Sequence, residues 1–183
     1  MDIIKENYFN QVKDILNRII YTHKTHEKMA DFYYKKYQIW SIAQVVTDSF
    51  TFSGIFLLIT QLLPRFQNII GIFSIILSFA ATLISVRNRT FDDKNNYIIH
   101  NKTAKNLLEL REKYQSFLID ISNDQLTIDE IKTKRKKLQK KLNTVYKYAP
   151  KTTKNAYTKA CKALDEDEKL KCTKEDEENI TQC

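Results

Sequence analysis

Glycine and proline are nearly absent from this 183-residue chain, which has only two of each. Sheet-rich folds need these residues at their turns, so the scarcity argues against a strand-dominated architecture and predicts an all-α fold. Cysteine is scarce too. Cys161, Cys172 and Cys183 lie in the polar C-terminal part, and their odd number and spacing fit neither a disulfide framework nor a Cys-x-x-Cys metal site. We interpret them as free cytosolic thiols.

Motifs that mark an enzyme are missing from the sequence. It contains no glycine-rich phosphate loop, no nucleophile elbow and no paired acid set, so we expect neither catalysis nor a cofactor. His23 and His26 have a spacing found in helical metal ligands, but no third ligand lies close in sequence, and we expect no metal. The stretch Met1–Asn7 is unlike a cleaved secretory signal, so the first apolar span is expected to direct insertion.

Apolar residues are concentrated in one block that divides into two spans of membrane-crossing length. Residues 39–63 carry one charge, Asp48, and as a helix rising about 1.5 Å per residue they reach about 37 Å. Residues 66–86 carry no charge and reach about 31 Å, against a hydrocarbon core of about 30 Å. Pro64 between them cannot continue the first helix, which predicts a tight hairpin. The alternative is a buried hairpin of a soluble protein, but spans this long and apolar are rare in soluble cores.

The charges around the spans predict their orientation. Basic residues flank the spans on their outer sides, whereas the loop between the spans has one. They are Lys24, Lys28, Lys35 and Lys36 before the first span, Arg87, Arg89 and Lys94 after the second, and Arg65 in the loop. By the positive-inside rule, both termini face the cytoplasm. Aromatic residues such as Trp40 at the start of the first span are typical of a headgroup belt.

Four parts follow one another along the chain. They are an N-terminal amphipathic helix and juxtamembrane segment (1–38), the transmembrane hairpin (39–86), a cytoplasmic helical region (87–164) and an acidic tail expected to be disordered (165–183). The apolar face of the first helix either lies on headgroups or packs on another cytoplasmic helix. After the second span, a long helix can continue directly from it. We expect that helix to pair with another that opens at the capping box Thr127–Glu130.

Polar residues share one face of the first span. They recur at three- and four-residue steps, with Thr47 beside them, and are Ser41, Gln44, Asp48 and Thr51. A carboxylate nine residues into a span costs several kcal/mol unless it meets water, a partner or a proton. Two helices cannot enclose a water-filled path, so the stripe predicts several copies that turn these residues inward as pore-lining or gating groups. The alternatives are plain helix packing and an Asp48 that is protonated or interfacial.

The second span carries a seam of small residues that lets helices approach closely. It consists of Gly71, Ser74, Ser78, Ala81 or Thr82, and Ser85. We interpret the seam as helix packing within one hairpin.

A dense basic run lies on the helix after the capping box. It consists of Lys132, Lys134, Arg135, Lys136, Lys137, Lys140 and Lys141. Such a run is usually a solvated helix face, and it can also bind anionic lipid, nucleic acid or the acidic tail. Nucleic acid is disfavoured because no aromatic residues interleave with the run and no base-reading motif occurs.

The order of these parts resembles the bacterial SLATT family of two-helix membrane effectors. The resemblance rests on Thr22 through Tyr37, the apolar hairpin, Asn88–Leu118, and Tyr148-Ala149-Pro150 leading to Ala156-Tyr157. It implies an antiphage effector in the bacterial inner membrane, found beside nucleotide-signalling, nucleotide-sensing or reverse-transcriptase genes. Such an effector forms pores or disrupts the membrane once infection is sensed, and halts or kills the host cell.

Two further expectations follow from the spans and the resemblance together. The chain is expected to form a homo-oligomer in contact with membrane lipid, and to receive its signal from a partner protein or nucleotide component encoded nearby. The chief alternative is a non-conducting membrane anchor or scaffold for a cytoplasmic partner. A soluble, nucleic-acid-binding helical protein is a distant third.

Overall fold

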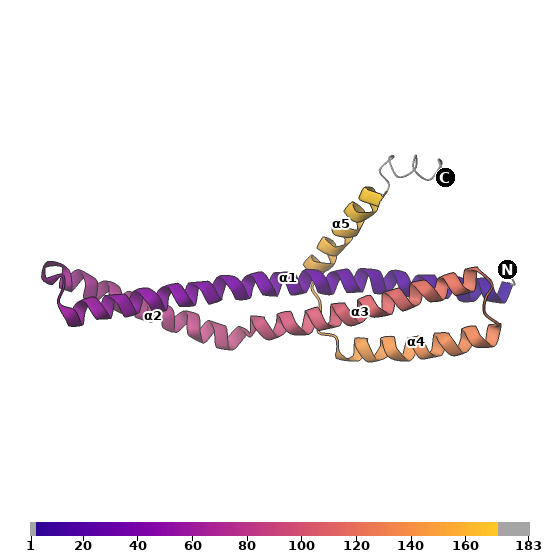
Figure 1. Ribbon diagram of the computed structural model, residues 1–183, viewed down its shortest axis with the longest axis horizontal. Coiled ribbons are helices and arrows are strands. Elements are labelled where there is room, and N and C mark those ends of the chain that lie inside the picture. The colour runs from indigo at the N-terminus through magenta and orange to yellow at the C-terminus, as the bar shows by residue number, and fades with distance from the viewer. Residues whose placement is uncertain (1–2, 172–183) are drawn as a thin grey trace. The chain divides into compact units, whose positions relative to one another are not determined.

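The computed structural model describes residues 3–171, with side chains as far as Asp165, and every regular element in this range is helical. The all-α prediction is therefore confirmed. The elements are α1 (Ile3–Thr60), the 3-10 helix η1 (Pro64–Phe66), α2 (Gln67–Phe91), α3 (Asp93–Ser122), α4 (Ile128–Tyr148) and α5 (Lys154–Lys171) (Figure 1). They form two compact units, which we call the apolar hairpin (Phe32–Tyr97) and the helical bundle (residues 3–31 and 98–171).

α1 is one helix of 58 residues that includes both the N-terminal amphipathic segment and the first span expected from the sequence. No glycine or proline precedes Gly54, so nothing in the sequence interrupts backbone hydrogen bonding over this length. The helix ends at Thr60, three residues before the expected end at Leu63. Gln61 adopts a left-handed φ of 50°, and Pro64 lacks the amide that the Thr60 carbonyl would accept from.

The two long helices of the apolar hairpin pack in an antiparallel register through small residues. At one level, a Cβ added to Gly54 would lie 2.1 Å from Ser74 Oγ and 3.3 Å from Ser74 Cβ. At another level, the Arg87 guanidinium lies 4.6 Å from the centroid of the Trp40 ring. The absence of a side chain at Gly54 is therefore what lets the helices approach there.

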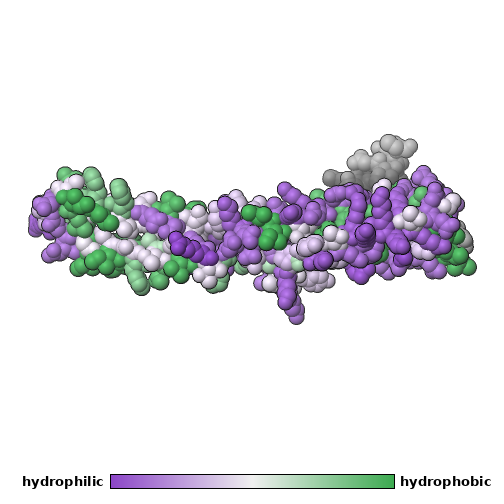
Figure 2. Space-filling view, turned by 90° about the horizontal axis from the view of Figure 1, so that it is seen from below, coloured by the Kyte–Doolittle hydropathy of each residue, from purple (hydrophilic) through white to green (hydrophobic). Residues whose placement is uncertain are grey.

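Large apolar side chains of the hairpin point outward. Ile39 is 64% exposed, Phe52 73% and Ile75 72%, and Figure 2 shows apolar side chains gathered over the surface of the α1–α2 pair. Soluble proteins rarely leave an apolar surface of this extent in water. Both helices are long and apolar enough to cross a membrane, and their apolar stretches are almost wholly unburied within the protein. These stretches are thus not the core helices of a soluble domain.

A single residue separates α2 from α3, whereas the sequence allowed one helix to continue from the second span. Asp92 adopts φ 27° and ψ 51°, which ends α2 at Phe91. The Asp92 carboxylate then accepts a hydrogen bond from the Asn95 amide at 3.2 Å, as an N-cap residue does. One aspartate therefore closes one helix and opens the next, without any proline or glycine.

The helical bundle has one apolar core shared by α1, α3 and α4. Its buried members are Val12, Ile15, Leu16 and Ile19 of α1, Leu107, Leu110, Tyr114, Phe117 and Ile121 of α3, and Ile131, Leu138 and Leu142 of α4. The N-terminal apolar face thus packs on other helices. In α3, Phe117 is fully buried, whereas Leu108 is 40% exposed.

The last two helices of the described chain are α4 and α5. Thr127 and Glu130 form the predicted capping box at the start of α4. α5 packs on α1 through the buried Ala156 and Ala160, and the Thr153 hydroxyl lies 3.5 Å from Met29 Sδ. α5 reaches Lys171, seven residues beyond position 164, where the cytoplasmic helical region was expected to end. The rest of the expected acidic tail, residues 172–183, lies outside the described residues.

Two histidines meet inside the bundle. His26 of α1 and His100 of α3 are each 2% exposed, and their Nδ1 atoms lie 2.9 Å apart. One Nδ1 must donate while the other accepts, so at least one of the two rings is neutral, with its Nδ1 unprotonated. Burial, with a smaller effect from His100 and His23, lowers the pKa of His26 to about 4, and burial also lowers the pKa of His100.

We predict that Gly54→Ala destabilises the hairpin while Gly71→Ala does not. The new methyl group at residue 54 overlaps Ser74, which costs about 1–3 kcal/mol. A methyl group at residue 71 meets only Leu58 Cδ2 at 4.0 Å, and alanine favours the helix by about 1 kcal/mol over glycine. Thermal unfolding in detergent, followed by circular dichroism, measures the difference. Equal melting temperatures for the two variants would contradict the packing, and Ser74→Gly should rescue Gly54→Ala.

We also predict that the bundle loses stability as the pH falls from about 6.5 toward about 4. The folded protein keeps His26 neutral while the unfolded chain binds a proton, so stability is complete above pH 6.5 and declines below it by a few kcal/mol. Urea unfolding at a series of pH values measures this slope. His26→Gln should flatten the slope, and an unchanged slope in that variant would show that other groups cause the acid sensitivity.

Candidate functional site

A polar groove follows the outside of the apolar hairpin between α1 and α2. Its volume is about 480 Å³. We call it the polar groove, and it is lined by Gln44, Asp48 and Thr51 of α1 and by Ser78, Ala81, Thr82, Ser85, Val86 and Arg89 of α2. Most of these side chains are polar, whereas the surfaces on either side are isoleucine, valine, leucine and phenylalanine. The groove is therefore a hydrophilic strip on a mostly apolar surface.

Asp48 supplies the carboxylate of the polar groove. Its side chain is exposed, and both of its carboxylate oxygens accept from Gln44 Nε2 at 2.9 Å. The pair is one helical turn apart, so Gln44 holds the carboxylate against the helix surface. Gln44 Oε1 is buried and has no hydrogen-bond partner among residues 3–171. A buried acceptor of this kind is satisfied when water or a cation enters the groove.

The threonine hydroxyl groups of the groove donate their protons to carbonyls of their own helices, so their oxygen atoms face the groove as acceptors. Thr51 donates to the Thr47 carbonyl at 2.8 Å, and Thr82 donates to the Ser78 carbonyl at 2.9 Å. A hydroxyl that donates to its own helix keeps its lone pairs free to accept. Together with Asp48, these oxygens form a surface that favours water and cations.

A second, smaller hollow lies at the end of the hairpin where α2 stops. Its volume is about 290 Å³, and its lining includes Ser41, Gln44 and Arg87. Because Gln44 lines both hollows, polar side chains continue from the polar groove to this end of the helix pair. Polar side chains therefore extend from Asp48 through Gln44 to Arg87 at the end of α2.

The structure separates the residues that the sequence grouped on the first span. Gln44, Asp48 and Thr51 line the polar groove, and Ser41 lines the smaller hollow. Thr47 lines neither hollow; it is half-buried, with its hydroxyl against the carbonyls of Ala43 and Gln44.

The small residues of the second span also divide. Ser74 is buried against Gly54, and a Cβ added to Gly71 would lie 4.0 Å from Leu58 Cδ2. Ser78 and Ser85 instead line the polar groove with Asp48. Sequence reasoning missed Gly54 and Arg89. The spacing of Arg89, four residues after Ser85 on the same helical face, is the signal that would have identified it.

A cluster of charged side chains lies at the end of the hairpin where α2 stops. The Asp93 side chain is 3% exposed, and it accepts from the Arg87 guanidinium and lies 3.7 Å from Lys36 Nζ. Arg87 also lies over the rings of Trp40 and Phe91, at 4.6 Å and 5.5 Å. The break at Asp92 is what brings Asp93 to Arg87. Five aromatic and charged groups therefore fix the end of α2 against α1.

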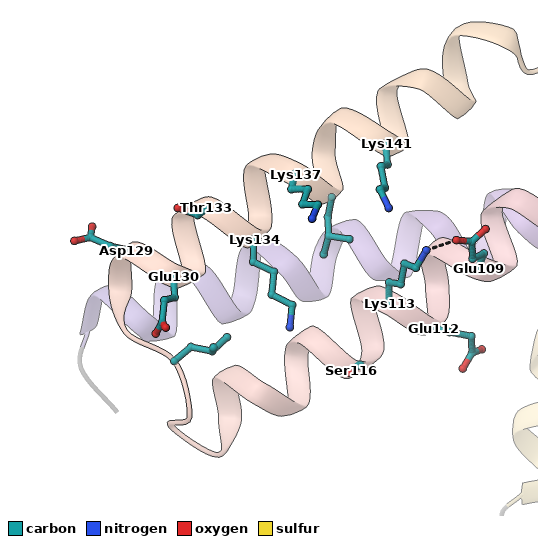
Figure 3. A pocket seen from close by; sticks show the side chains of 12 residues that line it. Glu109, Glu112, Lys113, Ser116, Asp129, Glu130, Thr133, Lys134, Lys137 and Lys141 are labelled. Atoms are coloured by element: carbon teal, nitrogen blue, oxygen red, sulfur yellow. Dashed lines mark hydrogen bonds and ion pairs between the residues drawn. The ribbon is translucent and has the colours of Figure 1, made fainter.

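The basic run of α4 divides between two surfaces. Lys132, Arg135, Lys136 and Lys140 line a shallow hollow of about 720 Å³ on one side of the helix. Lys134, Lys137 and Lys141 line a groove of about 1040 Å³ between α3 and α4 (Figure 3). Within residues 3–171, no three His, Cys, Asp or Glu side chains come together as metal ligands.

We predict that Arg87→Gln destabilises the hairpin far more than Lys36→Gln. Removing Arg87 leaves a buried carboxylate without its main partner, which costs about 3–5 kcal/mol. Lys36 is 37% exposed and more distant, so its removal costs about 0–1 kcal/mol. Thermal unfolding in detergent compares the two, and Asp93→Asn should restore part of the loss in Arg87→Gln. Similar losses for the two single variants would contradict a dominant Arg87–Asp93 pair.

Comparison with known proteins places the chain in a family. Residues 8–177 match the SMODS and SLOG-associating 2TM effector domain family 4. No curated protein and no solved structure matches the chain. The family match covers most of the chain, and its two transmembrane segments agree with the two apolar helices of the hairpin. The chain therefore belongs to the SLATT family of SMODS and SLOG-associating two-transmembrane effector domains, and its place is in a membrane.

Proposed function

We propose that this protein permeabilises the bacterial inner membrane as the effector of an antiphage system. Several copies assemble in the bilayer with their polar grooves turned inward, and the grooves together line a path for ions. Abortive infection follows, because a cell that loses its membrane gradients stops growing or dies. The proposal adds a pore and an assembly to the membrane effector that the family describes.

The observation that carries the proposal is the position of Asp48. It lies in the polar groove, on a helix whose large exposed side chains in the span are apolar. Facing lipid there, a carboxylate costs several kcal/mol, whereas facing water in a central path it costs little. Two helices cannot surround water, so the copies must do so together.

Charge at the ends of the hairpin supports the orientation. Arg87, Arg89 and Lys36 lie at the end where α2 stops, and Arg65 is alone at the turn. With the basic end in the cytoplasm, the chain crosses the membrane twice and both termini face the cytoplasm. The bundle then lies where a cytoplasmic signal reaches it.

Activation requires a partner that binds the conducting assembly better than the resting one. The SMODS and SLOG association in the family's name makes a nucleotide-signalling component the first candidate for that partner. A reverse-transcriptase component encoded nearby is the other. In either case the partner acts through the bundle.

A second function, membrane anchor or scaffold, has one observation in its favour. The bundle has two hollows on its surface whose linings include lysines of α4. An anchor would use these surfaces to hold a cytoplasmic partner and would conduct nothing. The polar groove has no role in an anchor. A substitution in the groove therefore distinguishes the anchor from the pore.

We predict that purified protein in lipid vesicles conducts cations, and that Asp48→Asn lowers the flux at least fivefold. A ring of carboxylates attracts cations, and the amide removes that charge without changing the shape. Flux is measured over rising protein-to-lipid ratios, because mass action drives assembly without the partner.

Ser49→Ala and Ser53→Ala are the matched controls. Both residues are exposed polar positions of α1 outside the polar groove, so the flux should stay at the wild-type level. A flux equal to that of protein-free vesicles at every ratio would contradict the pore and favour the anchor. Equal losses at Ser49 and Asp48 would contradict the role of the groove.

A further inference from the structure

The exposed side of α4 carries a hollow whose lining, within the described chain, includes no Asp or Glu. Its volume of about 720 Å³ lies within the range of about 300–1,000 Å³ that is usual for small-ligand sites. We call it the basic hollow. Its basic lining residues are Lys132, Arg135, Lys136, Lys140 and Lys147. A ligand that fits this hollow therefore carries negative charge.

Most of this positive charge is not compensated within the protein. Lys132 lies 3.3 Å from Asp129, but both side chains are exposed, so this pair is weak. Lys136, Lys140 and Lys147 form no ion pair with residues 3–165. After Asp129 is counted against the five basic residues, four positive charges remain for a ligand.

Arg135 offers the ligand a guanidinium group that is already held in place. Its Nη1 donates to Gln11 Oε1 of α1 at 2.6 Å, and the guanidinium lies 5.6 Å from the centroid of the Tyr8 ring. Its Nε is buried and has no hydrogen-bond partner among the described residues. A buried donor without a partner costs free energy, and arginine binds phosphate through two parallel hydrogen bonds. A phosphate at this edge of the guanidinium would satisfy the Nε proton.

The rest of the lining indicates which part of a ligand is bound. Gln139, Asn143 and Thr144 complete the hollow. Asn143 accepts a hydrogen bond from Gln139 at 2.8 Å, which leaves the Asn143 amide protons for a ligand oxygen. No aromatic residue among those described lines the hollow, so it offers no platform on which a base stacks. The ligand is therefore recognised through its charged groups and not through an aromatic ring.

The spacing of the lysines favours several linked phosphates over a single anion. Lys132, Lys136 and Lys140 follow one another at four-residue steps, which are about 6 Å each along one face of the helix. One small anion contacts one or two of them, whereas a chain of phosphates contacts all three and Arg135. A phosphate group also carries more negative charge and more acceptor oxygens than a carboxylate, so a short ligand can neutralise the whole row.

We propose that the basic hollow binds a soluble ligand with two or more linked phosphate groups. Arg135 binds one phosphate through its Nε edge, the row of lysines neutralises the others, and Asn143 donates to a phosphate oxygen. Binding does not depend on the proposed pore, because the affinity is measured in nanodiscs, which hold no ion gradient.

Isothermal titration calorimetry of the full-length protein in phosphatidylcholine nanodiscs tests the site, with inorganic triphosphate as the probe. We expect saturable binding that weakens as the salt concentration rises. ATP should bind no more tightly than triphosphate, because the hollow has no partner for the base. Absence of saturable triphosphate binding would overturn the proposal, and so would tighter binding of ATP.

Two double variants of α4 with equal charge distinguish the basic hollow from the rest of the helix. Lys136→Gln with Lys140→Gln removes two lysines of the hollow, whereas Lys137→Gln with Lys141→Gln removes two that line the groove between α3 and α4. All four side chains are exposed, so both variants should remain folded. The dissociation constant for triphosphate should rise at least tenfold in the first variant and less than threefold in the second. Equal losses would show a nonspecific charge effect and overturn the proposal.

Arg135→Lys separates the guanidinium from its charge. Lysine keeps the positive charge but cannot form two parallel hydrogen bonds with a phosphate. The affinity for triphosphate should fall at least fivefold, with the melting temperature of the ligand-free variant as the control for folding. An unchanged affinity in the folded variant would overturn the assignment of a phosphate to the Nε edge.

Competition distinguishes this ligand from other polyanions. Loss of triphosphate binding in nanodiscs that contain phosphatidylglycerol would assign the hollow to lipid headgroups. Polyglutamate and duplex DNA are compared with ATP as competitors at equal total negative charge. Stronger displacement of triphosphate by either polymer would assign the hollow to an acidic protein or to nucleic acid. Each of these results would overturn the proposal, whereas stronger displacement by ATP would support it.

Discussion

The hairpin carries a carboxylate on a mostly apolar surface that suits lipid, and the rest of its structure depends on this constraint. Asp48 lies in a groove of hydroxyl, amide and guanidinium groups, while isoleucine and phenylalanine cover the surfaces around it. Lipid stabilises the apolar surfaces and not the carboxylate, so one environment cannot satisfy both. The conflict disappears when the polar groove faces water and the rest of the hairpin faces acyl chains. Close packing at Gly54 and Ser74 holds the groove in one register.

The break after α2 gives the hairpin a defined end. Asp92 stops one helix and caps the next, and its neighbour Asp93 is thereby buried against Arg87. Arg87 in turn lies over Trp40, so the end of α2 is tied to α1 by a charge and an aromatic ring. A buried ion pair adds little net stability over an apolar pair, but it is costly to break, and so it specifies one geometry. Arg87, Asp92 and Asp93 line the smaller hollow at this end of the hairpin.

The bundle is stabilised differently, by an apolar core in water. Its leucine, isoleucine and aromatic side chains are fully removed from solvent, and the neutral His26–His100 pair satisfies its own hydrogen bond inside. Lysines cover the outside of α4, and their long stems shield the leucines beneath while their charges remain exposed. The same chain thus has one unit suited to lipid and one with an apolar core of its own.

The sequence by itself determined the helices, the two apolar spans and the capping box at Thr127, because each depends on residues close together in the chain. It also placed Gln44, Asp48 and Thr51 on one face, since the helical repeat alone fixes which side chains align. The pairing of that face with Ser78, Thr82 and Arg89, the close contact at Gly54 and the division of the lysines between two hollows were decided only by the tertiary structure. The reason is physical: periodicity fixes directions around one helix axis, whereas the rotation and register of two helices follow from how their side chains pack.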